Sequence, residues 1–303
     1  MPRLAVIGTG VIGSGWAARA LARGLEVRAW DPAPGYAVQL RAAVANAWPA
    51  LRRVGLARGA TRRRLRIAAT LAEAVEGADF IQENAPEDES LKRDLIAQID
   101  AVASSRVVIA SSSSGFLPSR LQDRCRHPER VLVGHPFNPV YLLPLVEVVG
   151  GKQTAPVRIE AAIRFYRSLG MRPLHVRSEV EGYLSDRLQE ALWREALHLV
   201  AAGVATTQEL DDAVIYGPGL RWAFMGTCLA FHMAGGEAGM RHMLEQFAIG
   251  QNSWTRLPAP KVTSTLARRM ISGTAAQAKR RSMKQLERWR DDRLIRVLEA
   301  VAK

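Results

Sequence analysis

Short apolar runs alternate with longer segments of helical periodicity along the first half of the chain. Such runs, apolar and partly β-branched, are typical of strands that are buried on both faces of a sheet. We expect strands at residues 4–7, 27–30, 65–68, 79–83, 107–110, 130–134, 145–149 and 173–176. We expect helices at residues 14–25, 39–53 (interrupted near Pro49), 71–76, 90–102 and 156–169. This alternation predicts βαβ units and a largely parallel sheet.

A glycine-rich turn joins the first expected strand to the first expected helix. Its pattern is G-x-G-x-x-G, and an acid, Asp31, follows the second expected strand. The first glycine permits the tight turn, the second lets backbone approach a pyrophosphate, and the third lets helix and strand pack closely. The helix N-terminus favours the phosphates, and Asp31 would accept hydrogen bonds from a ribose 2′-hydroxyl. The sequence therefore predicts NAD as cofactor, held by Asp31 and by Gly8, Gly10, Val11, Ile12 and Gly13.

The pattern changes after Gly182. One long helix is expected at residues 183–201, followed by further helices with loops at residues 217–219, 235–236 and 257–260. We therefore predict an α/β fold, with a Rossmann-type NAD-binding domain over residues 1–183 and an all-α domain over residues 184–303.

Composition narrows the setting. The chain has 303 residues, 48% of them hydrophobic, and no apolar run approaches the ~20 residues of a membrane span. It enters a strand almost at once, which leaves no room for a signal peptide. Cys125 and Cys228 lack the spacing of metal ligands. We expect a cytoplasmic protein with no metal site and no membrane partner.

The formal net charge of +13 raises the alternative of nucleic-acid binding. Most of the excess is arginine scattered along the chain, and the densest cluster is Arg62–Arg64 with Arg66. No aromatic residues are interleaved with that cluster, and no helix-turn-helix or zinc signature stands beside it. We expect no nucleic-acid partner.

A histidine stands at the end of an expected strand, where ligands of open α/β sheets bind. His135 follows the strand that ends at Gly134, and Glu147 lies twelve residues further on, in the next strand. An antiparallel return would place the carboxylate of Glu147 beside the imidazole, fixing its tautomer and stabilising the imidazolium. A serine run, residues 111–114, follows another strand at the same edge. It is either a solvated loop or a source of hydroxyls for the nicotinamide and a substrate oxygen.

Together these motifs resemble the 3-hydroxyacyl-CoA dehydrogenase family over essentially the whole chain. The matching segments are the glycine turn, the serine run, His-Pro-Phe-Asn-Pro at residues 135–139 and Leu-Val-Glu-Val at residues 145–148. The resemblance implies that His135 is the catalytic base, with Glu147 as its orienting partner. It also implies that Ser114 and Asn138 bond the substrate oxygen. The resemblance also implies that Glu87 and Lys92 contact the nicotinamide half of the cofactor.

Three stretches, residues 135–151, 191–200 and 217–226, resemble members of the family that oxidise L-carnitine. Acyl-CoA members carry asparagine in Gly-Phe-x-x-Asn-Arg, where this chain has Asp186. A trimethylammonium group has no donors and is held by aromatic faces and a carboxylate. The expected substrate residues are Ser114, Phe137, Tyr141, Asp186, Trp193, Arg221, Trp222 and Phe224. The alternative for each aromatic is a place in the core of the helical domain.

The family also implies a homodimer, paired through the helical domain. Two other functions remain open: oxidation of a different 3-hydroxy compound, such as a 3-hydroxyacyl-CoA or L-gulonate, and a non-catalytic structural role on the same fold. The arginines at residues 52, 53, 58 and 62–64 keep the CoA ester open as a substrate, because phosphates bind well to such side chains.

Overall fold

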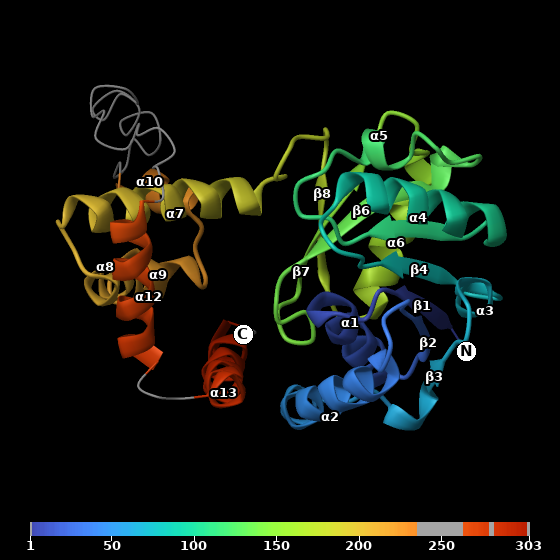
Figure 1. Cartoon of the computed structure of the whole chain (residues 1–303), viewed down its shortest axis with the longest axis horizontal. Helices are drawn as coiled ribbons and strands as arrows, with labels where there is room; N and C mark the ends of the chain where they lie inside the picture. The colour runs from blue at the N-terminus through green and yellow to red at the C-terminus, as the bar shows by residue number, and fades with distance from the viewer. Residues whose placement is uncertain (1, 235–262, 279–281, 302–303) are drawn as a thin grey trace. The chain divides into compact units, whose positions relative to one another are not determined.

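An eight-stranded sheet with helices on both faces forms the first part of the chain (Figure 1). The structure is a computed structural model that describes residues 2–234, 263–278 and 282–301. The strands are β1 (Arg3–Ile7), β2 (Glu26–Trp30), β3 (Leu65–Ile67), β4 (Phe80–Glu83), β5 (Val108–Ser111), β6 (Val131–Pro136), β7 (Leu145–Gly150) and β8 (Arg172–Val176). Each lies where a strand was predicted, within two residues at either end.

The strand order is β3-β2-β1-β4-β5-β6-β7-β8. Strands β1 to β6 are all parallel, β7 pairs antiparallel with β6, and β8 is parallel to β7. The chain adds β2 and β3 on one side of β1 and then crosses to place β4 on the other side. Ligands of such sheets bind outside the carboxyl ends of the strands at this switch point.

Two hydrophobic cores lie on opposite faces of the sheet because alternate strand residues point to opposite sides. In β1, Leu4 and Val6 join one core, and Ala5 and Ile7 join the other. The helices of the first core are α1 (Val11–Ala22), α2 (Tyr36–Val54) and α6 (Pro156–Ser168). The helices of the second core are α3 (Leu71–Val75), α4 (Glu89–Val102) and α5 (Pro118–Leu121), with short 3₁₀ turns η1 (Arg62–Arg64) and η2 (Pro128–Arg130) in the connections. The predicted Rossmann-type domain is confirmed.

Two predictions about helices in this part were wrong. Helix α1 begins at Val11, three residues earlier than predicted, because it starts directly on the glycine turn. Helix α2 runs without interruption through Pro49. Proline removes one backbone donor from a helix, but the neighbours Trp48 and Leu51 are buried in the first core and hold the segment in place.

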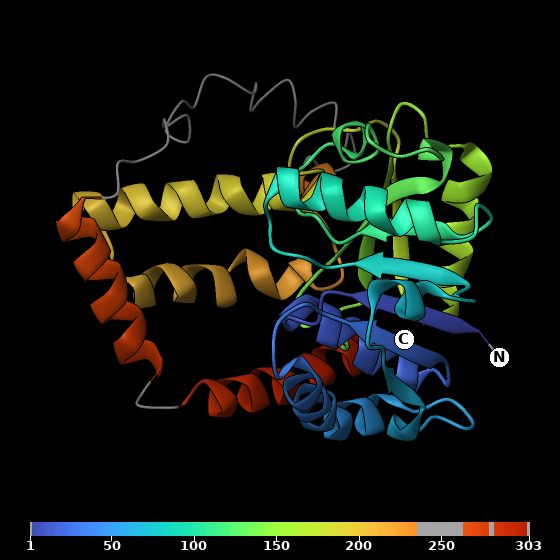
Figure 2. The same cartoon turned by 45° about the vertical axis from the view of Figure 1, so that its right-hand side comes forward.

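The rest of the described chain is helical (Figure 2). Its helices are α7 (Ser185–Ala202), α8 (Thr207–Ile215), α9 (Pro218–Trp222), α10 (Thr227–Ala234), α12 (Ser264–Ala278) and α13 (Met283–Val301). Arg269 of α12 donates hydrogen bonds to the carbonyls of Val200 and Ala201 at the end of α7. The all-α character predicted for this part is confirmed.

Two compact units divide the chain after Arg187, inside α7: residues 1–187 and residues 188–303. The prediction of a loop at residues 217–219 was wrong in part, because α9 begins at Pro218. Proline fits the first turn of a helix. The loops predicted at residues 235–236 and 257–260 lie outside the described residues. Among the helices that are described, none has the length and apolar character needed to cross a membrane.

Candidate active site

The glycine turn between β1 and α1 has the shape that a dinucleotide requires. Gly8 has φ +85°, and a Cβ there would lie 2.7 Å from the backbone of Asn84. A Cβ on Gly13 would lie 2.0 Å from the carbonyl oxygen of Gly8, so helix and strand pack with no room for a side chain. Gly10 faces open space, with nothing within 4 Å of a Cβ position. These residues fit a pyrophosphate on the backbone of the turn, at the N-terminus of α1.

Asp31 lies beside this turn, at the end of β2. Its Oδ2 accepts hydrogen bonds from the backbone N–H of Thr9, at 2.7 Å, and from the Thr9 hydroxyl. Its Oδ1 accepts a hydrogen bond from the N–H of Ala33. A carboxylate has about four acceptor positions, so Asp31 braces the turn and keeps capacity for one further donor. Contact with a ribose hydroxyl stays a prediction.

His135 and Glu147 lie directly opposite each other on the antiparallel pair β6 and β7. The imidazole Nδ1 is 2.9 Å from Oε2 of Glu147, and both side chains are buried. Because an ionised carboxylate only accepts hydrogen bonds, Nδ1 carries the proton and Nε2 presents its lone pair. The predicted contact between the two residues is confirmed.

The second oxygen of Glu147 is held at the N-terminus of α7. Oε1 accepts hydrogen bonds from the backbone N–H groups of Leu184 and Ser185 and from the Ser185 hydroxyl. Gly182 and Tyr183 precede them in left-handed conformations, with φ 70° and 46°. A tyrosine rarely adopts such a φ, and here the turn aims two backbone donors at one carboxylate. Because of this turn, α7 begins at Ser185. The prediction that it begins at Tyr183 was wrong.

These contacts decide the charge of Glu147. Burial raises its pKa, but hydrogen bonds from His135, Ser185 and Leu184 outweigh burial and bring the pKa below its ordinary value. Glu147 is therefore ionised near neutral pH and keeps His135 in the tautomer described above.

Nε2 of His135 faces a second carboxylate. Oδ2 of Asp186, in the first turn of α7, lies 3.7 Å from Nε2, beyond hydrogen-bond distance. The rings of Phe137 and Tyr183 lie against the imidazole, with centroids 4.8 and 5.5 Å away. The imidazole is thus fixed on three sides, and its basic atom is next to Asp186.

Glu87 organises the serine turn after β5. It accepts hydrogen bonds from the Ser113 hydroxyl at 2.6 Å and from the backbone N–H and hydroxyl of Ser114. Burial raises the pKa of Glu87, whereas the Ser113 bond, Lys92 and the backbone donors lower it, with a net fall. The serine run is therefore an ordered turn around a carboxylate. Bonding of Ser114 to a substrate oxygen stays a prediction.

Lys92 is buried, with 1% of its side chain exposed. Its ammonium group lies 3.1 Å from the fully buried carboxylate of Glu83, 2.9 Å from the carbonyl oxygen of Ala85 and 3.6 Å from Glu87. Glu83 also accepts a hydrogen bond from the Ser111 hydroxyl. Glu83 was not predicted as a site residue, although an acid that ends an apolar strand needs a buried partner. Lys92 supports the carboxylates of the site, and its expected contact with the cofactor stays a prediction.

A buried polar chain, also missed from the sequence, supports the strand ends. Tyr166 donates a 2.7 Å hydrogen bond to Gln82. Gln82 in turn donates to the Ser112 hydroxyl and to the carbonyl oxygen of Gly134, the residue before His135. A Cβ on Gly134 would lie 1.8 Å from the Tyr166 hydroxyl oxygen. This glycine lets α6 pack directly over the strand that carries the histidine.

The remaining predicted residues fall in two groups. Asn138 is exposed, and Tyr141 packs against the first core. Those in the second unit are mostly exposed: Trp193, Arg221, Trp222 and Phe224. Their contacts with a substrate stay predictions.

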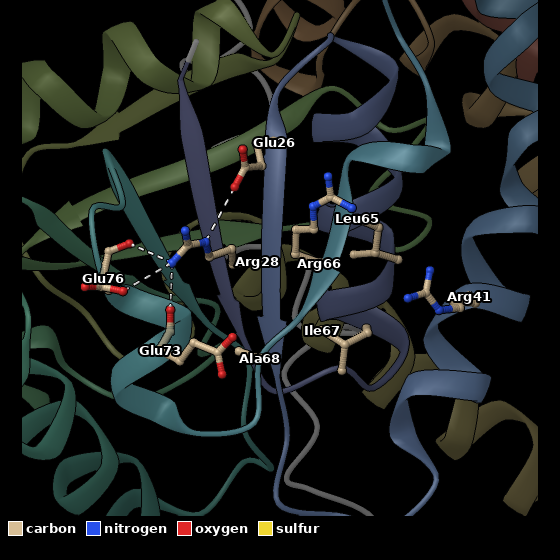
Figure 3. A pocket seen from close by; sticks show the side chains of 9 residues that line it. All are labelled: Glu26, Arg28, Arg41, Leu65, Arg66, Ile67, Ala68, Glu73 and Glu76. Atoms are coloured by element: carbon tan, nitrogen blue, oxygen red, sulfur yellow. Dashed lines mark hydrogen bonds and ion pairs between the residues drawn. The ribbon is translucent and has the colours of Figure 1, made fainter.

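A pocket of about 440 Å³ lies near the β3 edge of the sheet, along β2 and β3 (Figure 3). Arg28 lies at its centre, 3.5 Å from Glu26 and 3.7 Å from Glu76, so the charges largely neutralise one another. Three strands separate β2 from β6, and no residue predicted for the site lines this pocket. Within the described part of the chain, no group of three His, Cys, Asp or Glu side chains is arranged to hold a metal ion.

Comparison with known proteins agrees with this geometry. An L-carnitine dehydrogenase of Pseudomonas aeruginosa is 62% identical over 298 residues, which cover 98% of this chain and 93% of the relative. An L-carnitine dehydrogenase of Bacillus cereus is 54% identical over 302 residues, which cover 99% of this chain and 93% of the relative. Among solved structures, an NAD⁺-dependent 5-formyl-3-hydroxy-2-methylpyridine 4-carboxylic acid 5-dehydrogenase superposes with a TM-score of 0.83 at 28% identity, covering 100% of this chain and 99% of that one.

Both units match one family. Residues 3–180 match the NAD binding domain of 3-hydroxyacyl-CoA dehydrogenase, and residues 182–279 match its C-terminal domain. With a glycine turn shaped for a dinucleotide and a histidine held by a carboxylate at a strand end, the chain belongs to the 3-hydroxyacyl-CoA dehydrogenase family.

Proposed function

We propose that this protein oxidises L-carnitine at C3, with NAD⁺ as hydride acceptor, to give 3-dehydrocarnitine. The observation that carries the proposal is the His135–Glu147 pair, whose free imidazole nitrogen lies beside Asp186. The choice of substrate is supported by relatives named L-carnitine dehydrogenase, which are 50–62% identical over nearly the whole chain.

The residues act as a positioned general base. His135 accepts the C3 hydroxyl proton on Nε2, and Glu147 stabilises the imidazolium through Nδ1. Ser114 and Asn138 hydrogen-bond the oxygen as it becomes a ketone. The glycine turn and Asp31 would hold NAD⁺, which takes up the hydride from C3 when it is bound.

The charged ends of the substrate need partners of opposite character. We assign the trimethylammonium group to the aromatic faces of Phe137 and Tyr141 together with Asp186, all three in the first unit.

The proposal is tested by following NADH formation by the purified protein with NAD⁺. Turnover is expected with L-carnitine, and much less with D-carnitine, 3-hydroxybutyryl-CoA or L-gulonate. Turnover with the CoA ester alone would leave His135 as the base but refute the substrate. Inactivity with all of these compounds would favour a non-catalytic role.

Asp31 provides a test of the cofactor site. Asp31→Ala is expected to raise the KM for NAD⁺ about tenfold, the loss of one hydrogen bond to a charged group, and to relax discrimination against NADP⁺. Asp31→Asn is the matched variant, because its amide oxygen still accepts the hydrogen bond from Thr9 but carries no charge to repel a 2′-phosphate. Steady-state kinetics with both cofactors measures the effect. An unchanged preference for NAD⁺ in both variants would contradict the ribose role.

We further propose a homodimer formed through the second unit. Large apolar side chains are exposed on α7, among them Leu188 at 74% and Trp193 at 51%. Exposed apolar surface of this kind is typical of protein interfaces. Light scattering of the full chain is expected to give twice its mass of 33.3 kDa, and Leu188→Glu is expected to shift that mass towards the monomer.

A further inference from the structure

Two carboxylates lie beside the histidine of the site, and a third holds the serine turn. Glu147 is bonded to Nδ1, Asp186 lies 3.7 Å from Nε2, and Glu87 holds the serine turn. Of these three, Asp186 is the carboxylate beside Nε2, the atom that takes the substrate proton, and its side chain is partly exposed. A substrate bonded to Nε2 therefore lies against Asp186.

The shape of L-carnitine makes this position important. Its C3 carries a hydroxyl, a hydrogen and two arms, one ending in trimethylammonium and one in carboxylate, each joined through one methylene. With staggered bonds, the nitrogen of one arm and the carboxyl carbon of the other both lie about 3–4 Å from the hydroxyl oxygen. When the hydroxyl is bonded to Nε2 of His135, either arm can reach the side of Asp186. The reach of the two arms from the hydroxyl does not distinguish them, whereas their opposite charges do.

We infer that Asp186 attracts the ammonium arm, repels the carboxylate arm, and thereby decides which enantiomer of the substrate is oxidised. With the hydroxyl on Nε2 and the C3 hydrogen directed at the cofactor, exchanging the two arms converts one enantiomer into the other. A carboxylate beside Nε2 accepts only the enantiomer that places its cation there. The inference rests on the proposed function and assigns to Asp186 both charge selection and stereoselection.

The electrostatics of the first unit agree with a cationic ligand. Burial raises the pKa of Asp186, Glu147 and Glu87 raise it further, and His135 lowers it, leaving the pKa above its ordinary value. An anion that is raised in energy by other anions gains more from a bound cation than an isolated one. A second carboxylate at the same place would add repulsion, which is the basis of selection against the wrong arm.

The test removes the charge of Asp186 and the positive charge of the substrate, first separately and then together. Wild type and Asp186→Asn are compared on L-carnitine, on D-carnitine and on 3-hydroxy-5,5-dimethylhexanoate, in which a neutral tert-butyl group replaces trimethylammonium. For L-carnitine, kcat/KM is expected to fall about tenfold to hundredfold in the variant, and for the neutral analogue to change less than about threefold. The ratio of L- to D-carnitine activity is expected to fall at least about tenfold.

Binding is measured as well, in case the variant turns over too slowly to assay. The Kd of L-carnitine in the ternary complex with NADH, followed by NADH fluorescence, is expected to rise by the same factor, while that of the neutral analogue stays the same. Glu190→Gln is the control, because it removes a charge one turn further along α7 that is paired with Arg194.

Two results would overturn the inference separately from the function. If Asp186→Asn lowers kcat/KM by the same factor for the charged and neutral substrates and keeps the L-to-D ratio, Asp186 only positions His135. If Glu190→Gln produces the same shifts, the effect is that of overall charge. A wild-type enzyme that does not oxidise L-carnitine would refute the proposed function itself, and the inference with it.

Discussion

Replacing His135 with glutamine is expected to lower kcat about 10²–10⁴-fold, the range that a positioned general base contributes. Glutamine keeps a donor for Glu147, the partner 2.9 Å from the imidazole, but has no basic nitrogen for the hydroxyl proton. The Kd for NAD⁺ should stay within about twofold, because the glycine turn and His135 lie on different strands. Stopped-flow NADH formation and fluorescence titration measure the two quantities.

A matched control is present in the chain. His127 lies on the surface, 3.6 Å from Glu129, with about half of its side chain exposed. His127→Gln removes the same group without touching the site and should leave kcat unchanged. A His135→Gln enzyme as active as the His127→Gln control would refute the assignment of the base.

Replacing Lys92 with methionine is expected to lower the free energy of unfolding by about 3–5 kcal/mol, the cost of leaving one partner of a buried ion pair alone. Lys92 and Glu83 are both almost fully buried, and the ammonium group also bonds the carbonyl oxygen of Ala85. Without Lys92, the carboxylate of Glu83 keeps its bonds to Ser111 and Ala85 but loses its counter-charge. Urea unfolding followed by circular dichroism measures the loss.

The next residue of the same helix is the control for this prediction. Arg93 pairs with Asp123 at the surface, where solvent screens the charges, so Arg93→Met should cost much less than Lys92→Met. The double variant Glu83→Gln with Lys92→Met removes both charges and should recover part of the loss. If Lys92→Met costs no more than Arg93→Met, the buried pair does not stabilise the fold.

Much of the first unit could be predicted from the order of residues. All eight strands were found because apolar runs bounded by polar residues depend on near neighbours only. The glycine turn was predicted for the same reason, since each glycine is required by the backbone conformation or the packing at its own position. Helix α2 through Pro49 was missed, because burial of Trp48 and Leu51 against distant elements outweighs the local preference of proline.

Contacts within the site were predicted only between residues that lie in short sequence motifs. The pairing of His135 with Glu147 followed from two adjacent strands, and the structure confirms it. Asp186 was expected near the ammonium group of a substrate, but its distance of 3.7 Å from Nε2 depends on the left-handed turn at Gly182 and Tyr183. A positive φ at a tyrosine has no sequence signal.

The sequence by itself determined the two-part organisation, the glycine turn and the pairing of His135 with Glu147, because these depend on periodicity and short spacing. Only the tertiary structure decided what each charge does. Arg19, far from any predicted motif, is buried and donates to the carbonyls of Leu169, Val140 and Gly170, and burial together with Arg23 lowers its pKa to about 10. Whether a charged side chain binds a ligand, braces a loop or meets solvent depends on which distant groups surround it, because desolvation and Coulomb energies depend on distance in space and not on distance along the chain.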